Sequence, residues 1–483
     1  SDTGSRRGSL LPPSHNAPTM AHWTHTLIAA LACATPLCGQ SEDLPPEPPH
    51  IVVLLADDLG WGDVGFHGSE IPTPHLDALA ERGVRLEQFY VQPVCSPTRG
   101  ALMTGRYPMR LGLQLGVVRP WAQHGLPQNE RTLADALRGH GYATAICGKW
   151  HLGHAKPAML PTRRGFDRQY GHYNGALDYF THIRDGGHDW HRNDRECDDE
   201  GYTTDLIADE AVRVLAEHDH SKRLFLYVPF NAPHTPLQAP DDWIERMGHI
   251  EPRNRRVYAA MVACMDAAVG RIVAGLDEHG FAAEDTVVFF CSDNGGIRSL
   301  GSNGPLRGQK GLLYEGGVRV PAIVSWPGHH EAGSTVTAPL HIVDLYPTLL
   351  RIAGANLEQQ QPIDGLDAWA TIAKGALTPH EVILHNVTPW SGAIRMGRFK
   401  LVHNGAVQAN ATKGPAKDTW ELFDLDNDLG ETTDVTAEHE GVFEDLKARL
   451  EAFRAAQAAP HILPNNPPDG FEVPKVWGEA GER

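Results

Sequence analysis

The run Cys95-Ser96-Pro97-Thr98-Arg99-Gly100 places three groups that can do chemistry within six residues. Pro97 suits the first turn of a helix, because its missing N–H would have no partner there, and apolar residues follow it. Cys95 would then lie at a helix N-terminus, where free backbone N–H groups favour an anion. Arg99 follows Cys95 by about one helical turn and can reach the same spot. The run therefore offers a nucleophile, an anion-binding helix end and a fixed cation, with a buried cysteine beside a surface arginine as the alternative.

Carboxylate and amide side chains follow two apolar runs elsewhere in the chain. Asp57 and Asp58 come directly after residues 50–56, and Asp293 and Asn294 come shortly after residues 286–291. Adjacent carboxylates at the end of a buried strand are costly unless a cation neutralises them. Because all the donors are oxygens, the pattern indicates Ca²⁺ or Mg²⁺. An ordinary Asp-Asp turn remains the alternative for the first pair.

Basic side chains also follow apolar runs. Lys149 and His151 follow the apolar run 143–147 and alternate on one side of an extended segment. His234 follows the run 224–228 between two prolines, a position that suits a catalytic imidazole. The alternatives are a surface Lys-x-His pair and a structural histidine in a proline-rich turn. A further lysine, Lys310, stands in a glycine-flanked loop.

These side chains need a scaffold that brings the strand ends together. Continuous apolar runs are typical of central parallel strands, and ligands bind at the carboxyl ends of such strands. We therefore predict an α/β fold with a large mixed, mostly parallel sheet sandwiched by helices. Residues 1–49 are interpreted as an upstream extension, signal peptide and linker, 50–377 as the catalytic domain, and 378–483 as a C-terminal subdomain and tail. That subdomain is expected to hold a small antiparallel sheet and one helix.

Two segments are predicted from weaker patterns. Residues 84–91 are expected to form one strand that delivers Cys95. Residues 186–200 are strongly polar and are expected to form a solvated loop, in which four side chains could contact a substrate: Asp189, Trp190, His191 and Arg192.

Composition limits the partners and the compartment. The net charge of −18 argues against a nucleic-acid partner, because such binding depends on neutralisation of phosphates by Lys and Arg. Residues 27–37 form an apolar run too short to cross a bilayer, and we interpret it as a signal-peptide core with Met20 as the start. An imperfect lipidation box at residues 30–33 leaves a lipoprotein open. We expect a secreted or periplasmic protein with no stable membrane span.

Several of these runs resemble the type I, formylglycine-dependent sulfatases of the alkaline phosphatase superfamily. The resemblance rests on the Cys95–Gly100 run and on Thr104-Gly105-Arg106-Tyr107-Pro108, Gly148-Lys149-Trp150-His151-Leu152-Gly153 and Asp293-Asn294-Gly295-Gly296. It extends from Ile51 to about Asp424. Within the family the chain looks most like the arylsulfatase B (N-acetylgalactosamine 4-sulfatase) branch, although the sugar-binding segments differ.

The resemblance implies a cofactor, a modification and a set of roles. Cys95 would be oxidised to formylglycine by a formylglycine-generating enzyme or an equivalent maturase. Ca²⁺, or alternatively Mg²⁺, would be held by the modified Cys95 together with Asp57, Asp58, Asp293 and Asn294. The implied roles are as follows: Arg99 steadies Cys95, Lys149 and Lys310 bind sulfate oxygens, His234 serves the leaving oxygen as an acid or hydrogen-bond donor, His151 takes a proton from the nucleophile's second hydroxyl, and Asp293 accepts the nucleophile's proton.

The expected activity is hydrolysis of a sulfate ester on a carbohydrate, either glycosaminoglycan-like or algal. A phosphate or phosphonate monoester hydrolase of the same superfamily is the first alternative, and the complete Lys and His set favours sulfate over it. A sulfated-glycan-binding protein without catalysis is the second alternative, and the intact Cys95 and His151 argue against it.

Overall fold

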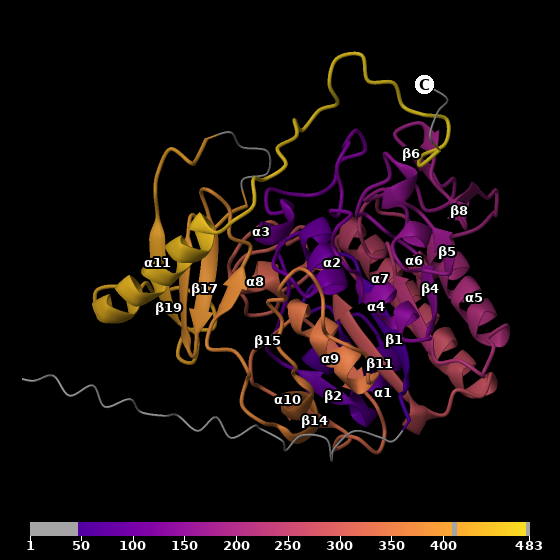
Figure 1. Cartoon of the computed structure of the whole chain (residues 1–483), viewed down its shortest axis with the longest axis horizontal. Helices are drawn as coiled ribbons and strands as arrows, with labels where there is room; N and C mark the ends of the chain where they lie inside the picture. The colour runs from indigo at the N-terminus through magenta and orange to yellow at the C-terminus, as the bar shows by residue number, and fades with distance from the viewer. Residues whose placement is uncertain (1–46, 408–412, 480–483) are drawn as a thin grey trace, which may run out of the picture. The chain divides into compact units, whose positions relative to one another are not determined.

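A ten-stranded mixed sheet forms the centre of the fold (Figure 1). The computed structural model describes residues 47–407 and 413–479, so the predicted signal peptide and lipidation box lie outside the described residues. The strands of this sheet are β1 His50–Ala56, β2 Val84–Leu86, β4 Ala143–Cys147, β5 Arg168–Gly171, β8 His191–Arg192, β9 Arg195–Glu196, β10 Leu224–Pro229, β11 Thr286–Ser292, β13 Ala322–Ser325 and β14 Ser334–Val336. Their order is β14-β2-β13-β11-β1-β10-β4-β5-β8-β9.

The four strands that precede the candidate site residues are neighbours in this sheet. β11, β1, β10 and β4 pair in parallel, so their carboxyl ends lie at one edge. Every residue of β1, β10 and β11 is buried, which is why their sequences are continuously apolar instead of alternating. The predicted α/β class and the mostly parallel centre of the sheet are confirmed.

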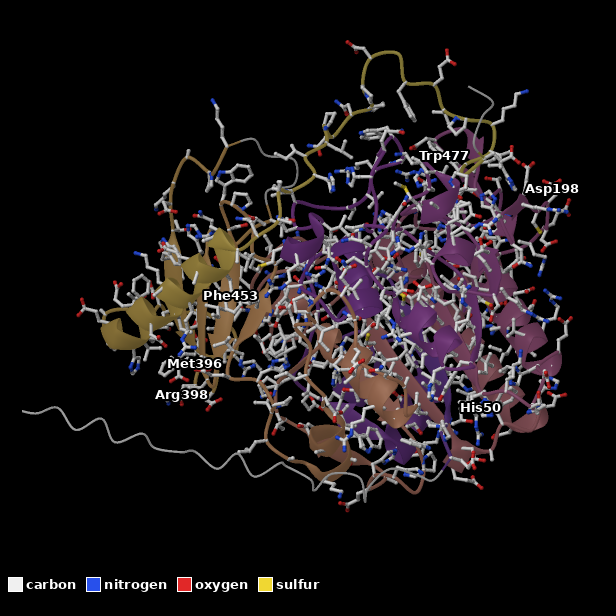
Figure 2. The ribbon with its side chains drawn as sticks, viewed as in Figure 1. His50, Asp198, Met396, Arg398, Phe453 and Trp477 are labelled. Atoms are coloured by element: carbon white, nitrogen blue, oxygen red, sulfur yellow. The ribbon has the colours of Figure 1, made fainter. Side chains whose placement is uncertain are left out.

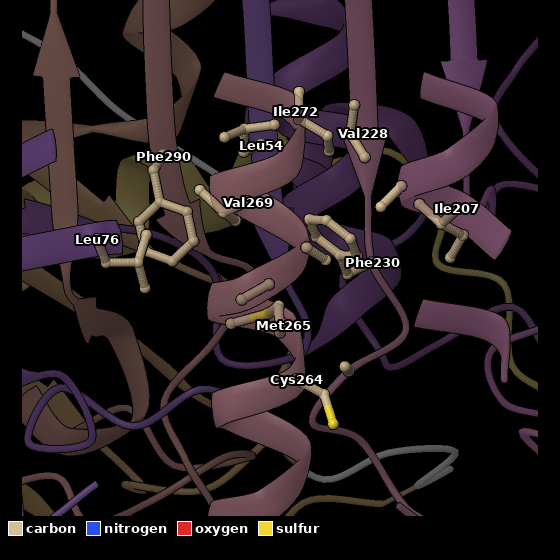
Figure 3. Packing of buried hydrophobic residues seen from close by; sticks show 14 of the residues in the cluster. Leu54, Leu76, Ile207, Val228, Phe230, Cys264, Met265, Val269, Ile272 and Phe290 are labelled. Carbon is tan, nitrogen blue, oxygen red and sulfur yellow. The ribbon is translucent and has the colours of Figure 1, made fainter. Parts of the chain in front are cut away.

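Helix α7 (Arg253–Glu278) is the main helix of the core. It packs against α1 (Pro74–Arg82), α5 (Thr203–Ala216) and α6 (Asp241–Arg246). Figure 3 shows its Met265, Val269 and Ile272 among side chains from β1, β10 and β11. Of the helices in the described residues, α7 alone is long and apolar enough to cross a membrane, but 78% of its most apolar window is buried. A core position accounts for that composition.

Six shorter helices lie elsewhere in the described part of the large domain. They are α2 Cys95–Thr104, α3 Pro108–Leu111, α4 Leu133–Gly139, α8 Glu315–Val318, α9 Leu345–Ile352 and α10 Trp369–Lys374. Helices α2, α4 and α9 contact one another, and α4 also packs on β4. The helix predicted at Cys95 is thus confirmed, with Cys95 as its first residue.

A second, smaller sheet lies in the C-terminal part of the chain. Its antiparallel strands are β16 Ile383–His385, β17 Gly392–Met396, β18 Phe399–His403 and β19 Trp420–Asp424, and α11 (Glu440–Ala455) packs on it. This confirms the predicted small sheet with one helix. The described residues form one unit, so the boundary at residue 377 stays a prediction. After α11 the described residues 456–479 form a tail without helix or strand, which runs back to the strand pair β6 (Ile183–Arg184) and β7 (Gly187–His188) (Figure 1).

The single strand predicted for residues 84–91 is wrong. Residues 84–86 form β2 of the large sheet, whereas β3 (Phe89–Tyr90) belongs to a separate three-stranded sheet with β12 (Arg319–Val320) and β15 (Leu340–His341). The backbone N–H of Glu87 still bonds Val336, and the chain then changes partners. No glycine or proline marks this change in the sequence.

The solvated loop predicted for residues 186–200 is wrong for the first part of this segment, whereas residues 192–200 are half-buried or exposed. β7, β8 and β9 occupy this segment, and Asp189 and Trp190 are fully buried within it. The Asp189 carboxylate accepts hydrogen bonds from the backbone N–H groups of Tyr173 and Asn174, so its charge serves to order a neighbouring turn. The buried polar residue Asp189 is thus accounted for by hydrogen bonding within the fold.

Candidate active site

The loops after β1, β11, β10 and β4 bring the predicted site residues together. Backbone hydrogen bonds continue beyond the strands, from Asp57 N to Ala232 O, from Asp293 N to Ala56 O and from Lys149 N to Pro229 O, at 2.8–3.0 Å. The strand ends therefore fix the starting points of four loops within one cluster.

The acidic side chains form the buried part of this cluster. The Asp58 backbone N–H donates to Asp293 Oδ1 at 3.3 Å, and Asn294 Nδ2 donates to Asp58 Oδ1 at 2.7 Å. Asp57, Asp58, Asp293 and Asn294 are all at most 2% exposed. Burial raises the pKa of Asp293 to about 6, and the nearby Asp57 adds to this shift. The predicted quartet is thus one buried cluster.

Cys95 stands beside these carboxylates at the start of α2. Its Sγ lies 3.4 Å from Asp57 Oδ1 and 3.6 Å from Lys310 Nζ. Burial raises the pKa of the Cys95 thiol, and the charges of Asp293 and Asp57 raise it further. Although a helix N-terminus favours a thiolate, burial among carboxylates outweighs it here. The unmodified thiol is therefore protonated and a weak nucleophile.

Arg99 connects several members of this cluster by hydrogen bonds. Its Nη2 donates to Asp293 Oδ2 at 2.9 Å and to Asp57 Oδ2 at 3.3 Å, and its Nη1 donates to the Lys149 carbonyl at 3.0 Å. The side chain is fully buried. Arg99 therefore fixes three of the loops relative to helix α2.

The two lysines differ in position. Lys310 Nζ lies 2.7 Å from Asp58 Oδ1 and lines the cavity described below. Lys149 is fully buried, and its Nζ donates to Asp57 Oδ2. Because Lys149 does not line the cavity, its direct contact with a sulfate oxygen stays a prediction.

His151 is held in one orientation. Its Nε2 donates to the Val118 carbonyl at 3.0 Å, and its Nδ1 is buried without a partner. Burial lowers the pKa of His151 far below its usual value, as does the charge of Lys149. Ser96 supports this arrangement, since its Oγ donates to the His151 carbonyl and accepts from Val118 N–H. The sequence interpretation missed Ser96, whose only signal was its place next to Cys95.

His234 faces the acidic cluster from the other side. Its Nε2 lies 3.7 Å from Asp58 Oδ2, and its Nδ1 lies 2.6 Å from the Thr235 carbonyl. Burial lowers the pKa of His234, and Lys310 lowers it further. The imidazole can thus present its Nε2 to a ligand above Asp58.

The donor set fits a hard divalent cation. Ligand atoms of Asp57, Asp58, Cys95 and His234 lie within 4.8 Å of one another. Asn294 Oδ1 is buried without a hydrogen-bond partner, an arrangement that a cation would relieve. Asp293 directs its carboxylate to Arg99 instead, so its place among the ligands stays a prediction.

A cavity of about 330 Å³ opens above the cluster. Cys95, His151, His234 and Lys310 contribute to its walls, together with residues 116–120 and 175–176. Asp189, Trp190, His191 and Arg192, the candidate substrate contacts of the polar segment, do not line it. The predicted nucleophile and the basic side chains thus border a space that can admit a small ligand.

Comparisons with known proteins agree with this geometry. The family described as Sulfatase matches residues 49–355, and the family described as N-sulphoglucosamine sulphohydrolase, C-terminal, matches residues 308–456. Arylsulfatase J of Mus musculus is 37% identical, over 89% of this chain and 80% of its own length. N-acetylgalactosamine-6-sulfatase of Mus musculus is 34% identical, over 74% and 72%.

A solved structure is similar over most of both chains. The crystal structure of Ps i-CgsB in complex with k-i-k-neocarrahexaose superposes with a TM-score of 0.78 at 33% identity, covering 86% of this chain and 95% of that one. The resemblance to the arylsulfatase B branch in particular stays a prediction. The cluster around Cys95, the fold that builds it and these matches lead to one conclusion: the chain belongs to the sulfatase family and is a sulfatase.

Proposed function

We propose that this sulfatase removes sulfate from a sulfated carbohydrate, using formylglycine formed from Cys95 and a bound divalent ion, Ca²⁺ in the first instance. The observation that carries the proposal is the position of Cys95, at the floor of a cavity, between Lys310 and the Asp57–Asp58 pair. Two similar proteins support the carbohydrate: N-acetylgalactosamine-6-sulfatase, and Ps i-CgsB in its complex with k-i-k-neocarrahexaose.

The high pKa of the Cys95 thiol supports the need for modification. A protonated, buried thiol attacks poorly, whereas an aldehyde hydrate offers two hydroxyl groups at the same place. Formylglycine would supply the hydroxyl that attacks sulfur, and the divalent ion would favour its ionised form and screen the negative charge of the sulfate. Asp57, Asp58 and Asn294 would hold that ion, with Asp293 beside them.

The other side chains bind the ester and move protons. Lys310 can place its positive charge on sulfate oxygens, where negative charge accumulates during transfer. His234 can donate to the leaving oxygen from Nε2. His151 is neutral with a free Nδ1, so it can accept a proton from the nucleophile. Asp293, with its pKa raised to about 6, is a second base near the nucleophile.

Maturation and export belong to the same proposal. Cys95 requires a formylglycine-generating enzyme or an equivalent maturase as a partner. We infer secretion or delivery to the periplasm from the apolar run at residues 27–37, with a lipoprotein as the other form.

The proposal is tested by hydrolysis of 4-nitrophenyl sulfate and 4-nitrophenyl phosphate by protein produced together with a maturase. We expect the sulfate to be preferred, activity to fall with a chelator, and Cys95→Ala to abolish turnover. Cys197→Ala is the matched control, because Cys197 lies outside the site. Preference for the phosphate would establish the phosphohydrolase alternative. Binding of sulfated glycan without turnover by modified protein would establish the non-catalytic alternative.

A further inference from the structure

Two arginines that the activity does not use stand at the wall of the active-site cavity. Arg119 follows the Val118 carbonyl that holds His151, and Arg184 ends β6. Both line the cavity together with Lys310. No carboxylate is among the described residues that line it, although Lys310 pairs with Asp58 just beneath the wall. The two arginines therefore add positive charge to the wall beyond the site of sulfur attack.

The C-terminal tail contacts both arginines. Asn465 Oδ1 accepts from Arg119 Nη2 at 3.0 Å, and Trp477 Nε1 donates to the Arg184 carbonyl at 2.8 Å. Trp477, labelled in Figure 2, is only 2% exposed. Its backbone N–H also bonds the His188 carbonyl at 2.9 Å, next to β6. The tail thus holds the side chain of Arg119 and the backbone of Arg184 at one wall.

Their charges are incompletely compensated. Burial lowers the pKa of Arg119, and the neighbouring charge of Arg184 lowers it further, which shows that the two guanidinium groups repel each other. Arg119 Nε is buried without a hydrogen-bond partner, whereas Arg184 Nε lies 3.1 Å from Oδ2 of the exposed Asp185. An anion between the two arginines would relieve the repulsion and give Arg119 Nε a partner.

We propose that Arg119 and Arg184 form a subsite for a second anionic group, a carboxylate or a second sulfate, carried by the same sulfated carbohydrate. The subsite rests on the proposed function, because the scissile sulfate occupies the place beside Cys95 and Lys310. Planar guanidinium groups suit both carboxylate and sulfate oxygens in paired hydrogen bonds. The substrate is accordingly a carbohydrate with at least two negative groups, such as a disulfated sugar or a sulfated sugar linked to a uronic acid.

The test measures inhibition of 4-methylumbelliferyl sulfate hydrolysis by three matched disaccharides. Each contains a sulfated N-acetylgalactosamine linked to a uronic acid. The first has the free uronate and one sulfate, the second has the uronate methyl ester and one sulfate, and the third has the methyl ester and two sulfates. We expect the free uronate or the second sulfate to bind at least about tenfold more tightly than the singly charged ester, and the preferred one identifies the anion. High salt should reduce the difference.

Substitutions test whether the preference for a second anion depends on the two arginines. Arg119→Gln and Arg184→Gln should each remove most of this preference, with a much smaller change in kcat/KM for the aryl sulfate, which has no second anion. Arg195→Gln, at an exposed residue of β9, should change neither measurement. Equal binding of all three disaccharides by the unaltered protein, or an equal loss for all three in the variants, would overturn the subsite. If neither the aryl sulfate nor the sulfated disaccharides are hydrolysed, the proposed function fails, and calorimetric titration with the same disaccharides still decides whether the arginines bind the second anion.

Discussion

Replacing Arg99 by methionine should destabilise the protein strongly, because Arg99 neutralises two buried carboxylates. The side chain has no exposed surface, and it donates to Asp293, to Asp57 and to the Lys149 carbonyl. Methionine fills a similar volume but leaves the carboxylates without this cation. Removal of one partner from a buried ion pair costs about 3–5 kcal/mol, and we expect a loss of that size in Arg99→Met. The pKa of Asp293 is already raised to about 6 with Arg99 present, so the variant should take up a proton there.

The assay is urea unfolding at pH 7.5 in the presence of a chelator, followed by the same measurement with Ca²⁺. Arg168→Met is the matched control, because Arg168 forms an exposed ion pair with Glu217 at 2.8 Å, and such pairs contribute at most about 1 kcal/mol. Ca²⁺ should restore part of the stability of Arg99→Met by supplying a second cation to the carboxylates. A loss below about 1 kcal/mol in the chelator, equal to that of the control, would refute this account of the cluster.

Three further predictions concern other parts of the molecule. Lys310→Met should lower kcat for an aryl sulfate by roughly 10²–10³-fold without unfolding the protein, as kinetics and circular dichroism can show; a kcat within threefold of the unaltered protein would count against its role. Burial raises the pKa of Glu431 to about 7, although Lys400 lies 3.0 Å away, so the folded state holds a proton that the unfolded state releases above pH 4.5. Stability of the unaltered protein relative to Glu431→Gln should therefore fall by about 3 kcal/mol as pH rises from 4.5 to 7, and a pH-independent difference in unfolding free energy would contradict this. Trp477→Ala should expose residues 459–479 to proteolysis and weaken binding of the doubly anionic disaccharides, whereas an unchanged cleavage pattern would show that Trp477 does not anchor the tail.

The central fold could be predicted from the sequence because its strands are buried on both faces. Such strands appear as uninterrupted apolar runs, and the charged residues that end them are conspicuous for that reason. Asp57, Lys149 and Asp293 each follow such a run, and the structure places them in one cluster. Because the strands before these residues are parallel neighbours in one sheet, their carboxyl ends place the site residues side by side.

Other features depend on pairing between distant segments, which local composition does not encode. Glu87 marks a change from one sheet to another without any turn residue. Asp189 belongs to a polar segment, yet it is buried because Tyr173 and Asn174 supply its hydrogen bonds. The arginine pair could not be predicted for the same reason, since Arg119 and Arg184 come from separate segments that meet only at the wall of the cavity.

The most direct test of the account joins peptide mass spectrometry with activity in the same preparations. Protein made with and without a maturase is analysed for the fraction of Cys95 converted to formylglycine and for the rate of sulfate release. The account predicts that the rate rises in proportion to that fraction and vanishes when conversion is absent. Full sulfatase activity in protein whose Cys95 remains an unmodified thiol would contradict it.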